Sequence, residues 1–277
     1  MRRYVEPEPA LVEVPLLGGD VTEGVVRVGE TVRRPPGPHS AAVRAYLEHL
    51  ERVGFDGAPR FLGIDARGRD VLSFVPGENA GRPLHAWARD EAVLLAIARL
   101  QRNLHDRSAG FALPAGVAWP EPACIQGVAP AYDVADVVGH NDMTPENLIF
   151  VDRRLTGVVD FDLAGPTTRL LDIVTTLLWC APLRAPADRD PLLRDADSVR
   201  RARLFADAYG LAPAERARLP EVAARRYARS WHVMRYNAER RGGGWRRMWD
   251  DGVGDVILRG QAWFEAERPR FAAAFAD

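Results

Sequence analysis

The segment VVGHNDMTPENLIF, residues 137–150, places polar side chains suited to metal and phosphate chemistry between two apolar runs. These side chains belong to His140, Asp142 and Asn147. Because the apolar runs predict buried strands, the polar residues must project from a loop that the core holds in place. A carboxylate and an amide oxygen are ligands that Mg²⁺ prefers, and no cluster of His and Cys competes for a softer metal. The segment is therefore either an active-site loop or a polar turn.

The residues that follow supply a second carboxylate. In NLIFVDRRLTGVVDFD, two short strands joined by the polar DRR predict a hairpin that brings Asn147 and Asp160 together. The pattern H-x-D-x-x-x-x-N, then a strand turn and D-F, matches phosphoryl transfer. In that chemistry one Asp accepts the proton of the acceptor hydroxyl, while the Asn and the later Asp hold metal on the nucleotide. Coincidence does not readily explain all of these features, so we favour an active site.

These two segments carry a resemblance to a known family. HNDMTPENLIF, together with GVVDFDLAGPTTRLLDI, resembles the catalytic core of the aminoglycoside phosphotransferases, whose pattern is roughly H-G-D-x-x-x-x-N, I/V-D-W/F, G-P and D-L/I. The resemblance extends over nearly the whole chain. It implies an α+β, two-lobed protein-kinase-like fold. It also implies ATP-dependent transfer, with GTP as the alternative donor, to a hydroxyl of an aminoglycoside-like antibiotic or a metabolite.

The resemblance also implies roles for individual residues. Asp142 is expected to be the catalytic base, and Asn147 and Asp160 are expected to bind Mg²⁺. His140, the other residue assigned to the catalytic loop, would brace it. Asp172, in LLDI, would hydrogen-bond that loop from beneath.

The expected roles of two more residues are less specific. Asp162 would either touch a metal-bound water or act as a structural carboxylate, and we favour the structural role. His105, in NLHD, resembles a His that is common at the end of a helix in this family, and we expect it to be structural.

A change from β-like to helical residue patterns divides the chain into two expected lobes. Short β-like runs and one helix-like stretch, Ser40 to Val53, fill the first part as far as about Val75. Helical patterns then dominate, so we expect a nucleotide-clamping lobe at 1–76 and a catalytic and substrate-binding lobe at 77–277. The expected helices of the second lobe cover residues 90–106, 168–179, 198–210, 221–242 and 253–275.

The first lobe resembles a nucleotide clamp. In LLGGDVTEGVVRV, Gly18 and Gly19 would let backbone amides approach the phosphates without a Cβ in the way. The segment VLSFVPGE resembles the connection between lobes, where Phe74 and Val75 would meet the adenine.

The family's phosphate-binding lysine has no counterpart, because all 37 basic residues are Arg. We expect Arg33 in this role and Arg34 as the alternative, since only one of two successive strand side chains can face the cleft. The Glu that steadies this lysine in the family is also missing: Val43 and Arg44 stand at its expected place, and Glu48 lies a turn later. A nucleotide-binding protein that no longer transfers phosphate is therefore the competing hypothesis. A protein kinase is less favoured, because DFD replaces D-F-G and no A-P-E follows.

Composition and charge limit the partners and the location that we expect for this protein. The formal net charge of −1 argues against nucleic-acid binding. The longest apolar run, Ile173 to Leu183, is too short to cross a bilayer, and the first residues lack a signal-peptide pattern. We therefore expect a cytoplasmic monomer or homodimer with no membrane partner. Cys124 and Cys180 are far apart, and we expect both to be buried thiols.

The acceptor is not identified by the sequence. Asp250, Asp251 and Asp255 could suit a cationic aminoglycoside, whereas the Arg- and Trp-rich stretch before them could suit an anionic or aromatic substrate. The third interpretation, which we favour, is an amphipathic helix with Trp231 in the core.

Overall fold

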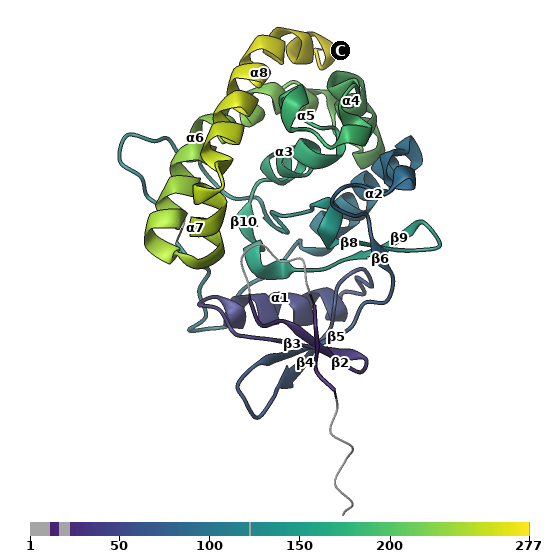
Figure 1. Ribbon diagram of the computed structural model, residues 1–277, viewed down its shortest axis with the longest axis vertical. Coiled ribbons are helices and arrows are strands. Elements are labelled where there is room, and N and C mark those ends of the chain that lie inside the picture. The colour runs from purple at the N-terminus through teal and green to yellow at the C-terminus, as the bar shows by residue number, and fades with distance from the viewer. Residues whose placement is uncertain (1–11, 17–22, 122, 277) are drawn as a thin grey trace, which may run out of the picture.

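The computed structural model describes residues 12–16, 23–121 and 123–276, in which a small sheet-containing lobe precedes a larger helical lobe (Figure 1). The small lobe is a five-stranded antiparallel sheet with the strand order β1-β2-β3-β5-β4. These strands are Val14–Pro15, Val26–Val28, Thr31–Arg34, Asp70–Ser73 and Phe61–Ile64, in sheet order. The sequence does not predict β4, whose FLGI is short and contains a glycine.

One helix, α1 (Ser40–Arg52), lies between this sheet and the larger lobe (Figure 1). It buries Ala42, Tyr46 and Leu50, which recur every four residues, together with Leu47 beside Tyr46. The Tyr46 hydroxyl also donates to the carbonyl of Val138 in the larger lobe at 3.0 Å, so α1 connects the two lobes.

Two small β-structures follow in the second half of the chain. Strand β7 (Val137–Gly139) pairs with β10 (Gly165–Thr167), and β8 (Leu148–Val151) pairs with both β6 (Glu78–Asn79) and β9 (Arg154–Val158). The turn between β8 and β9 has positive φ at both central residues, 50° at Asp152 and 61° at Arg153, as a tight two-residue hairpin turn requires. The predicted hairpin is therefore confirmed.

The larger lobe is mainly helical. Its helices are α2 (Glu91–Arg107), α3 (Arg169–Cys180), α4 (Ser198–Tyr209), α5 (Pro213–Arg216), α6 (Leu219–Arg241), α7 (Gly243–Asp250) and α8 (Val253–Ala274). All five predicted helices are present, whereas α5 and α7 are not predicted. Local signals explain the ends of α4: the Asp197 carboxylate accepts from the first-turn amides of the helix, and Gly210, at φ 83°, ends it.

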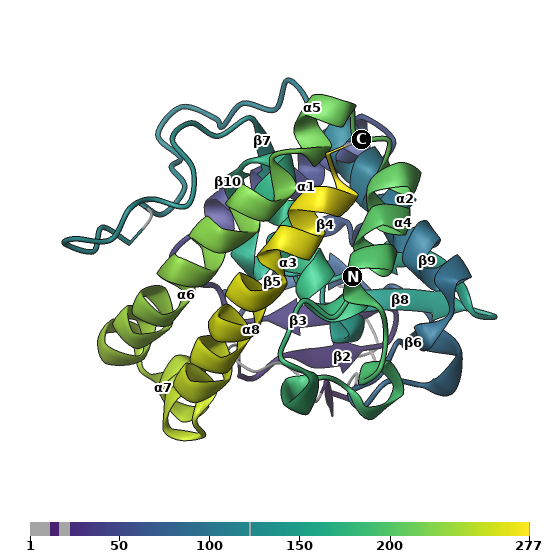
Figure 2. The same ribbon diagram turned by 90° about the horizontal axis from the view of Figure 1, so that it is seen from above.

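The core of this lobe lies between α3 and the surrounding helices. Ile173 of α3, Leu104 of α2, Phe205 of α4 and Phe264 of α8 are fully or almost fully buried in it. Seen from above, α6, α7 and α8 lie together along one side of the molecule (Figure 2). Helix α3 contacts β7, and α2 contacts β7 and β9, so these two helices hold the small β-structures in place.

Two sequence expectations can be compared directly with this fold. Cys124 is exposed, so the expectation that both thiols are buried is wrong for this residue, which lies in the irregular segment after α2. Cys180 is half-buried, and removal of its sulfur from water raises the pKa of the thiol to about 12. Within the described ranges, every helix is either too short or too polar to cross a membrane.

Candidate active site

The predicted catalytic loop, His140 to Asn147, is short, and hydrogen bonds within it hold Asn147 against Asp142. Asn147 is buried, and its Nδ2 donates to the Asp142 carbonyl at 2.9 Å and to Asp142 Oδ2 at 3.1 Å. Pro145 begins the single 3₁₀ turn that ends at Asn147, which fixes the backbone between the two functional side chains. The five-residue spacing noted in the sequence thus places a carboxylate and an amide side by side.

The β8–β9 hairpin brings Asp160 back to this loop. Leu148 is paired with Val158, and the amide of Val159 donates to the Asn147 carbonyl at 2.8 Å. Asp160 has φ 64° and ψ 68°, a left-handed conformation that turns the chain sharply at the end of β9. The predicted meeting of Asn147 and Asp160 is confirmed.

Asp172 supports the loop from beneath, as expected. It is fully buried at the start of α3, where Oδ1 accepts from the Asn141 amide at 2.8 Å and Oδ2 from the His140 amide at 3.2 Å. Burial alone would raise the pKa of this carboxyl, but the hydrogen bond from His105 and the nearby imidazoles hold it below its ordinary value. An ionised carboxylate at this position fixes two consecutive amides of the catalytic loop.

His140 and His105 are both buried and both structural. His140 Nε2 donates to the Val159 carbonyl at 3.0 Å, and its Nδ1 accepts from the Asp142 amide at 3.3 Å. His105 bridges Tyr209 and Asp172 at 2.7 and 2.8 Å. Burial lowers the pKa of His140, although the charge of Asp172 opposes this, so its neutral tautomer holds Asp142 through the backbone.

Asn141 occupies the position between His140 and Asp142 where the family pattern has glycine. It has φ 62°, in the left-handed region that glycine and asparagine tolerate best. Its Nδ2 donates to the carbonyls of Leu163 at 3.1 Å and Gly165 at 3.3 Å. The side chain therefore fastens the catalytic loop to the segment that follows Asp160, a contact that glycine cannot make.

Arg34 faces Asp160, and Arg33 does not. Arg34 Nη2 donates to Asp160 Oδ1 at 2.9 Å, and Asp162 forms a second ion pair with the same guanidinium. Arg33 donates to Thr31 Oγ1 at 2.6 Å and has no contact with Asp160. Arg34, the alternative to Arg33 for the phosphate-binding role, is therefore the arginine that lies beside Asp160, because strand alternation turns the Arg33 side chain to the other face of β3.

Where the family has a lysine on the sheet and a glutamate on the following helix, this chain has the charges the other way round: the helix carries an arginine and the sheet a carboxylate. Arg44 of α1 donates from Nε to Asp70 Oδ1 at 2.7 Å, and Asp70 is the cross-strand partner of Arg34. Glu48 is exposed on α1, in agreement with a surface charge. Helix α1 thus contributes a cation rather than a carboxylate to the region behind β3.

In the connection between the lobes, the backbone amide of Phe74 is hydrogen-bonded, whereas within the described ranges that of Val75 is not. The Phe74 amide donates to the Glu30 carbonyl at 2.9 Å, and the centroid of the Phe74 ring lies 3.6 Å from the Arg27 guanidinium carbon. Among the described residues, no hydrogen bond uses the Val75 amide. Gly18 and Gly19, expected at the phosphates, lie outside the described residues.

A cavity of about 580 Å³ opens beside the Arg34–Asp160 pair. Its walls come from α1, from the connection between β3 and α1, from Asp160 to Leu163, and from Arg241 to Trp245 at the junction of α6 and α7. Asp142 and Val75 do not line it. The cavity therefore reaches one candidate metal ligand from the side of α1.

The sequence profile described as "Phosphotransferase enzyme family" matches residues 29–205, more than half of the chain. The chain belongs to this phosphotransferase family. The trifolitoxin immunity protein of Rhizobium leguminosarum bv. trifolii is 31% identical over 208 residues, which are 74% of this chain and 76% of that protein.

Solved structures confirm the kinase-like fold of this family member. A choline/ethanolamine kinase family protein from Mesorhizobium loti has a TM-score of 0.61 at 17% identity and covers 96% of this chain and 93% of its own. The GDP complex of wild-type aminoglycoside 2'-phosphotransferase-IIIa has a TM-score of 0.54 at 14% identity, with coverage of 96% and 95%. The predicted two-lobed α+β class is thus correct.

The oxygen atoms of Asn147 and Asp160 would suit a metal ion that also binds oxygens of the substrate. Within the described part of the chain, no group of three or more His, Cys, Asp or Glu side chains forms a metal cage. Asn147 donates through Nδ2, which directs its Oδ1 away from Asp142. One amide oxygen and the Asp160 carboxylate are the kind of partial ligand set that Mg²⁺ completes with water and phosphate.

The acidic residues near the C-terminus do not gather around a site. Asp250 is exposed and accepts two hydrogen bonds from Arg246 of its own helix, each 3.0 Å long. Trp231 is half-buried and packs against Trp249, with the ring centroids 5.3 Å apart, so it joins α6 to α7 rather than filling the main core.

Four further residues lie close to one another near the predicted catalytic loop: Arg82, Trp179, Arg184 and Arg226. The sequence does not single out Arg82, Trp179 or Arg184, whereas Arg226 belongs to the Arg- and Trp-rich stretch noted above. Only folding brings them together.

Proposed function

We propose that this phosphotransferase moves the γ-phosphoryl group of ATP, with GTP as the alternative donor, to a hydroxyl of a small molecule. The observation that carries the proposal is the convergence of Asp142, Asn147 and Asp160, which the loop hydrogen bonds and the β8–β9 hairpin hold together. This set matches the requirements of phosphoryl transfer, namely one base and two oxygen ligands for the metal on the nucleotide.

Asp142 is proposed as the base. Its carboxylate would accept the proton of the acceptor hydroxyl as the acceptor oxygen bonds to the γ-phosphorus. The bond from that phosphorus to the bridging β–γ oxygen breaks, and ADP departs with the bridging oxygen. His140 contributes by position, because it is buried and its imidazole accepts from the Asp142 amide.

Asn147 Oδ1 and Asp160 would hold Mg²⁺, which neutralises phosphate charge when bound. Arg34 is proposed as the cation that replaces the missing lysine, since it already lies at Asp160. Its planar guanidinium binds phosphate oxygens in pairs, whereas an ammonium acts as a point charge. Residues 1–76 would clamp the nucleotide, with Val75 beside the adenine, and residues 77–277 would hold the acceptor.

The relative named as a trifolitoxin immunity protein supports a protective role, in which phosphorylation inactivates a toxic hydroxyl compound. The competing proposal is a nucleotide-binding protein without transferase activity. It is favoured by the Arg34–Asp160 ion pair, which uses both a phosphate-binding cation and a metal ligand.

Nucleotide turnover against a panel of hydroxylated antibiotics and metabolites tests the two proposals, with Asp142→Asn as the matched variant. We expect at least one acceptor to stimulate ADP formation in the wild type and not in the variant, while both proteins bind ATP. Turnover that no acceptor raises above the level of Asp142→Asn would refute the transferase and leave nucleotide binding.

A further inference from the structure

Three arginines and a tryptophan lie close to one another, and one of the arginines, Arg82, is hydrogen-bonded to the predicted catalytic loop. The Arg184 guanidinium carbon lies 3.7 Å from the centroid of the Trp179 ring, and that of Arg82 lies 5.2 Å from the same ring. The charge of Arg226, on α6, acts on both Arg184 and Asp142. We call Arg82, Arg184 and Arg226 the arginine cluster.

The cluster is attached directly to the catalytic loop. Arg82 Nη1 donates to Glu146 Oε1 at 3.0 Å, and Glu146 precedes Asn147 in the chain. Arg226, on α6, donates to Thr175 Oγ1 of α3 at 3.1 Å and to Ser230 Oγ of its own helix at 3.2 Å. Arg82 therefore connects the cluster to the loop that carries the proposed base, and Arg226 connects it to α3 and α6.

The positive charge of the cluster is not fully balanced. In the part of the chain that the structure describes, no carboxylate lies within ion-pair distance of Arg184 or Arg226. Asp188, which acts on Arg184 from further away, accepts two hydrogen bonds from Arg259 at 2.6 and 2.9 Å. Asp142 and Glu146 offset part of the charge of the cluster, and the positive charge that no described carboxylate pairs with is that of Arg184 and Arg226.

Burial makes this arrangement costly without a partner. Burial, together with the charges of Arg226 and Arg82, lowers the pKa of Arg184 to about 10. Arg82 is 54% exposed, so water screens its charge, whereas the half-buried Arg184 and Arg226 repel each other more strongly, and a bound anion reduces that repulsion. The stacking of Arg184 on Trp179 leaves the edge of its guanidinium, where the N–H groups are, available to an oxyanion.

A second observation points to a ligand at the same place. Glu146 Oε2 is buried, and it accepts no hydrogen bond from any described residue. A buried carboxylate oxygen without a donor is costly, and a ligand hydroxyl would satisfy it. The arginine cluster and this oxygen together suit a compound that carries both an oxyanion and hydroxyl groups.

We propose that the arginine cluster binds a carboxylate or phosphate group of the acceptor, so that the substrate is an anionic hydroxyl compound and not a polycationic aminoglycoside. This inference rests on the proposed transferase function. The oxyanion contacts Arg184 and Arg226, the apolar part of the acceptor lies on Trp179, and one hydroxyl is presented to Asp142.

Four small acceptors that share a hydroxyl test the charge preference: glycerate, glycerol 3-phosphate, neutral glycerol and cationic choline. Binding is measured by calorimetry on the nucleotide-loaded Asp142→Asn protein, and transfer is measured on the wild type. Glycerate and glycerol 3-phosphate distinguish a carboxylate from a phosphate source. We expect one of the two anions to bind at least about tenfold more tightly than glycerol and choline.

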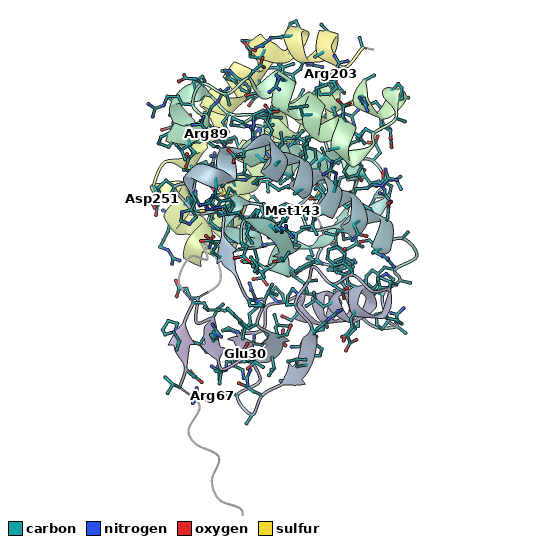
Figure 3. All side chains as sticks on the ribbon, turned by 90° about the vertical axis from the view of Figure 1, so that its right-hand side faces the viewer. Glu30, Arg67, Arg89, Met143, Arg203 and Asp251 are labelled. Carbon is teal, nitrogen blue, oxygen red and sulfur yellow. The ribbon has the colours of Figure 1, made fainter. Side chains whose placement is uncertain are left out.

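The variants Arg184→Gln and Arg226→Gln are expected to weaken that anion by about 10- to 100-fold, with ATP affinity unchanged. Arg184→Lys keeps a charge and should restore part of the affinity, which separates anion binding from loss of fold. Arg203→Gln is the control, because Arg203 is exposed on α4 and lies far from Met143, the neighbour of Asp142 (Figure 3).

The outcomes separate the two proposals. Equal binding of all four compounds, or equal weakening of all four by Arg184→Gln, would overturn the anion site even if transfer to another acceptor is found. Anion binding that depends on Arg184 without transfer to any acceptor would keep the site and refute the transferase.

Discussion

Arg34 and Asp160, 126 residues apart in the sequence, form a hydrogen-bonded ion pair at 2.9 Å across the two lobes. The pair joins the proposed phosphate-binding cation to a proposed metal ligand. Asp162 contacts the same guanidinium, so β3 and the end of β9 are held together by one arginine. On the proposed assignment, binding of nucleotide with its metal would exchange this ion pair for contacts with phosphate and Mg²⁺.

Arg34→Ala should weaken ATP binding by about tenfold or more, because a charge-assisted contact with phosphate is lost. Arg33→Ala is the matched control, since Arg33 faces Thr31 on the other side of the strand. Fluorescence titration with a nucleotide analogue measures both affinities. An equal loss of affinity in the two variants would contradict the assignment to Arg34.

Asp160→Asn should weaken binding of Mn²⁺, a spectroscopic substitute for Mg²⁺, in the presence of ADP by about tenfold or more, because a neutral amide is a poorer ligand than a carboxylate. Electron paramagnetic resonance reports the free Mn²⁺ directly and does not depend on turnover. Asp162→Asn removes the neighbouring carboxylate and should have a smaller effect. A larger loss in Asp162→Asn would reassign the metal ligand.

Asn141→Ala should destabilise the protein by about 1–3 kcal/mol, because alanine strains a backbone with positive φ and removes both amide hydrogen bonds. Asn141→Gly loses the same hydrogen bonds but relieves the strain, so it should be more stable than Asn141→Ala. Urea unfolding of the three proteins gives the order. Alanine equal to or better than glycine would show that the left-handed backbone is not maintained in solution.

The free energy of unfolding should fall as the pH decreases below about 6.5. Burial lowers the pKa of His140 in the folded state from its ordinary value of 6.5, so the unfolded chain takes up a proton first and is favoured by acid. His140→Gln keeps a donor for the Val159 carbonyl and should flatten the slope between pH 7 and 5.5, measured by urea unfolding. An unchanged slope would assign the effect to other groups.

Asp172 adds a second loss of stability at lower pH. Its pKa is held below the ordinary value of 3.8, so its stabilisation is complete above about pH 4 and disappears as the pH falls through the folded-state pKa. Asp172→Asn should cost about 2–4 kcal/mol at neutral pH, because the loop amides and His105 lose a charged acceptor. Thermal unfolding of this variant near that of the wild type would contradict the supporting role.

The catalytic segment could be predicted because its signals are local. The spacing of Asp142 and Asn147, the hairpin before Asp160 and the apolar periodicity of the helices are all contained in short stretches. Where the local signals are weak, the sequence does not predict the element: β4 contains a glycine, and α7 begins directly after Gly242 at the end of α6. The usual preference of cysteine predicts a buried Cys124, but its segment is irregular and the residue is exposed.

The sequence by itself determined which chemistry we propose for the loop, because the proposed base and the two proposed oxygen ligands lie at fixed spacing within one short segment, residues 142–160. Tertiary structure alone decided which arginine meets Asp160. Alternation along β3 separates Arg33 from Arg34, but only the packing of the sheet on the larger lobe shows which face is the cleft. Tertiary structure also assembled the arginine cluster. Arg82, Arg226 and the end of α3 with Arg184 come close to one another only when the helices and loops that carry them pack together.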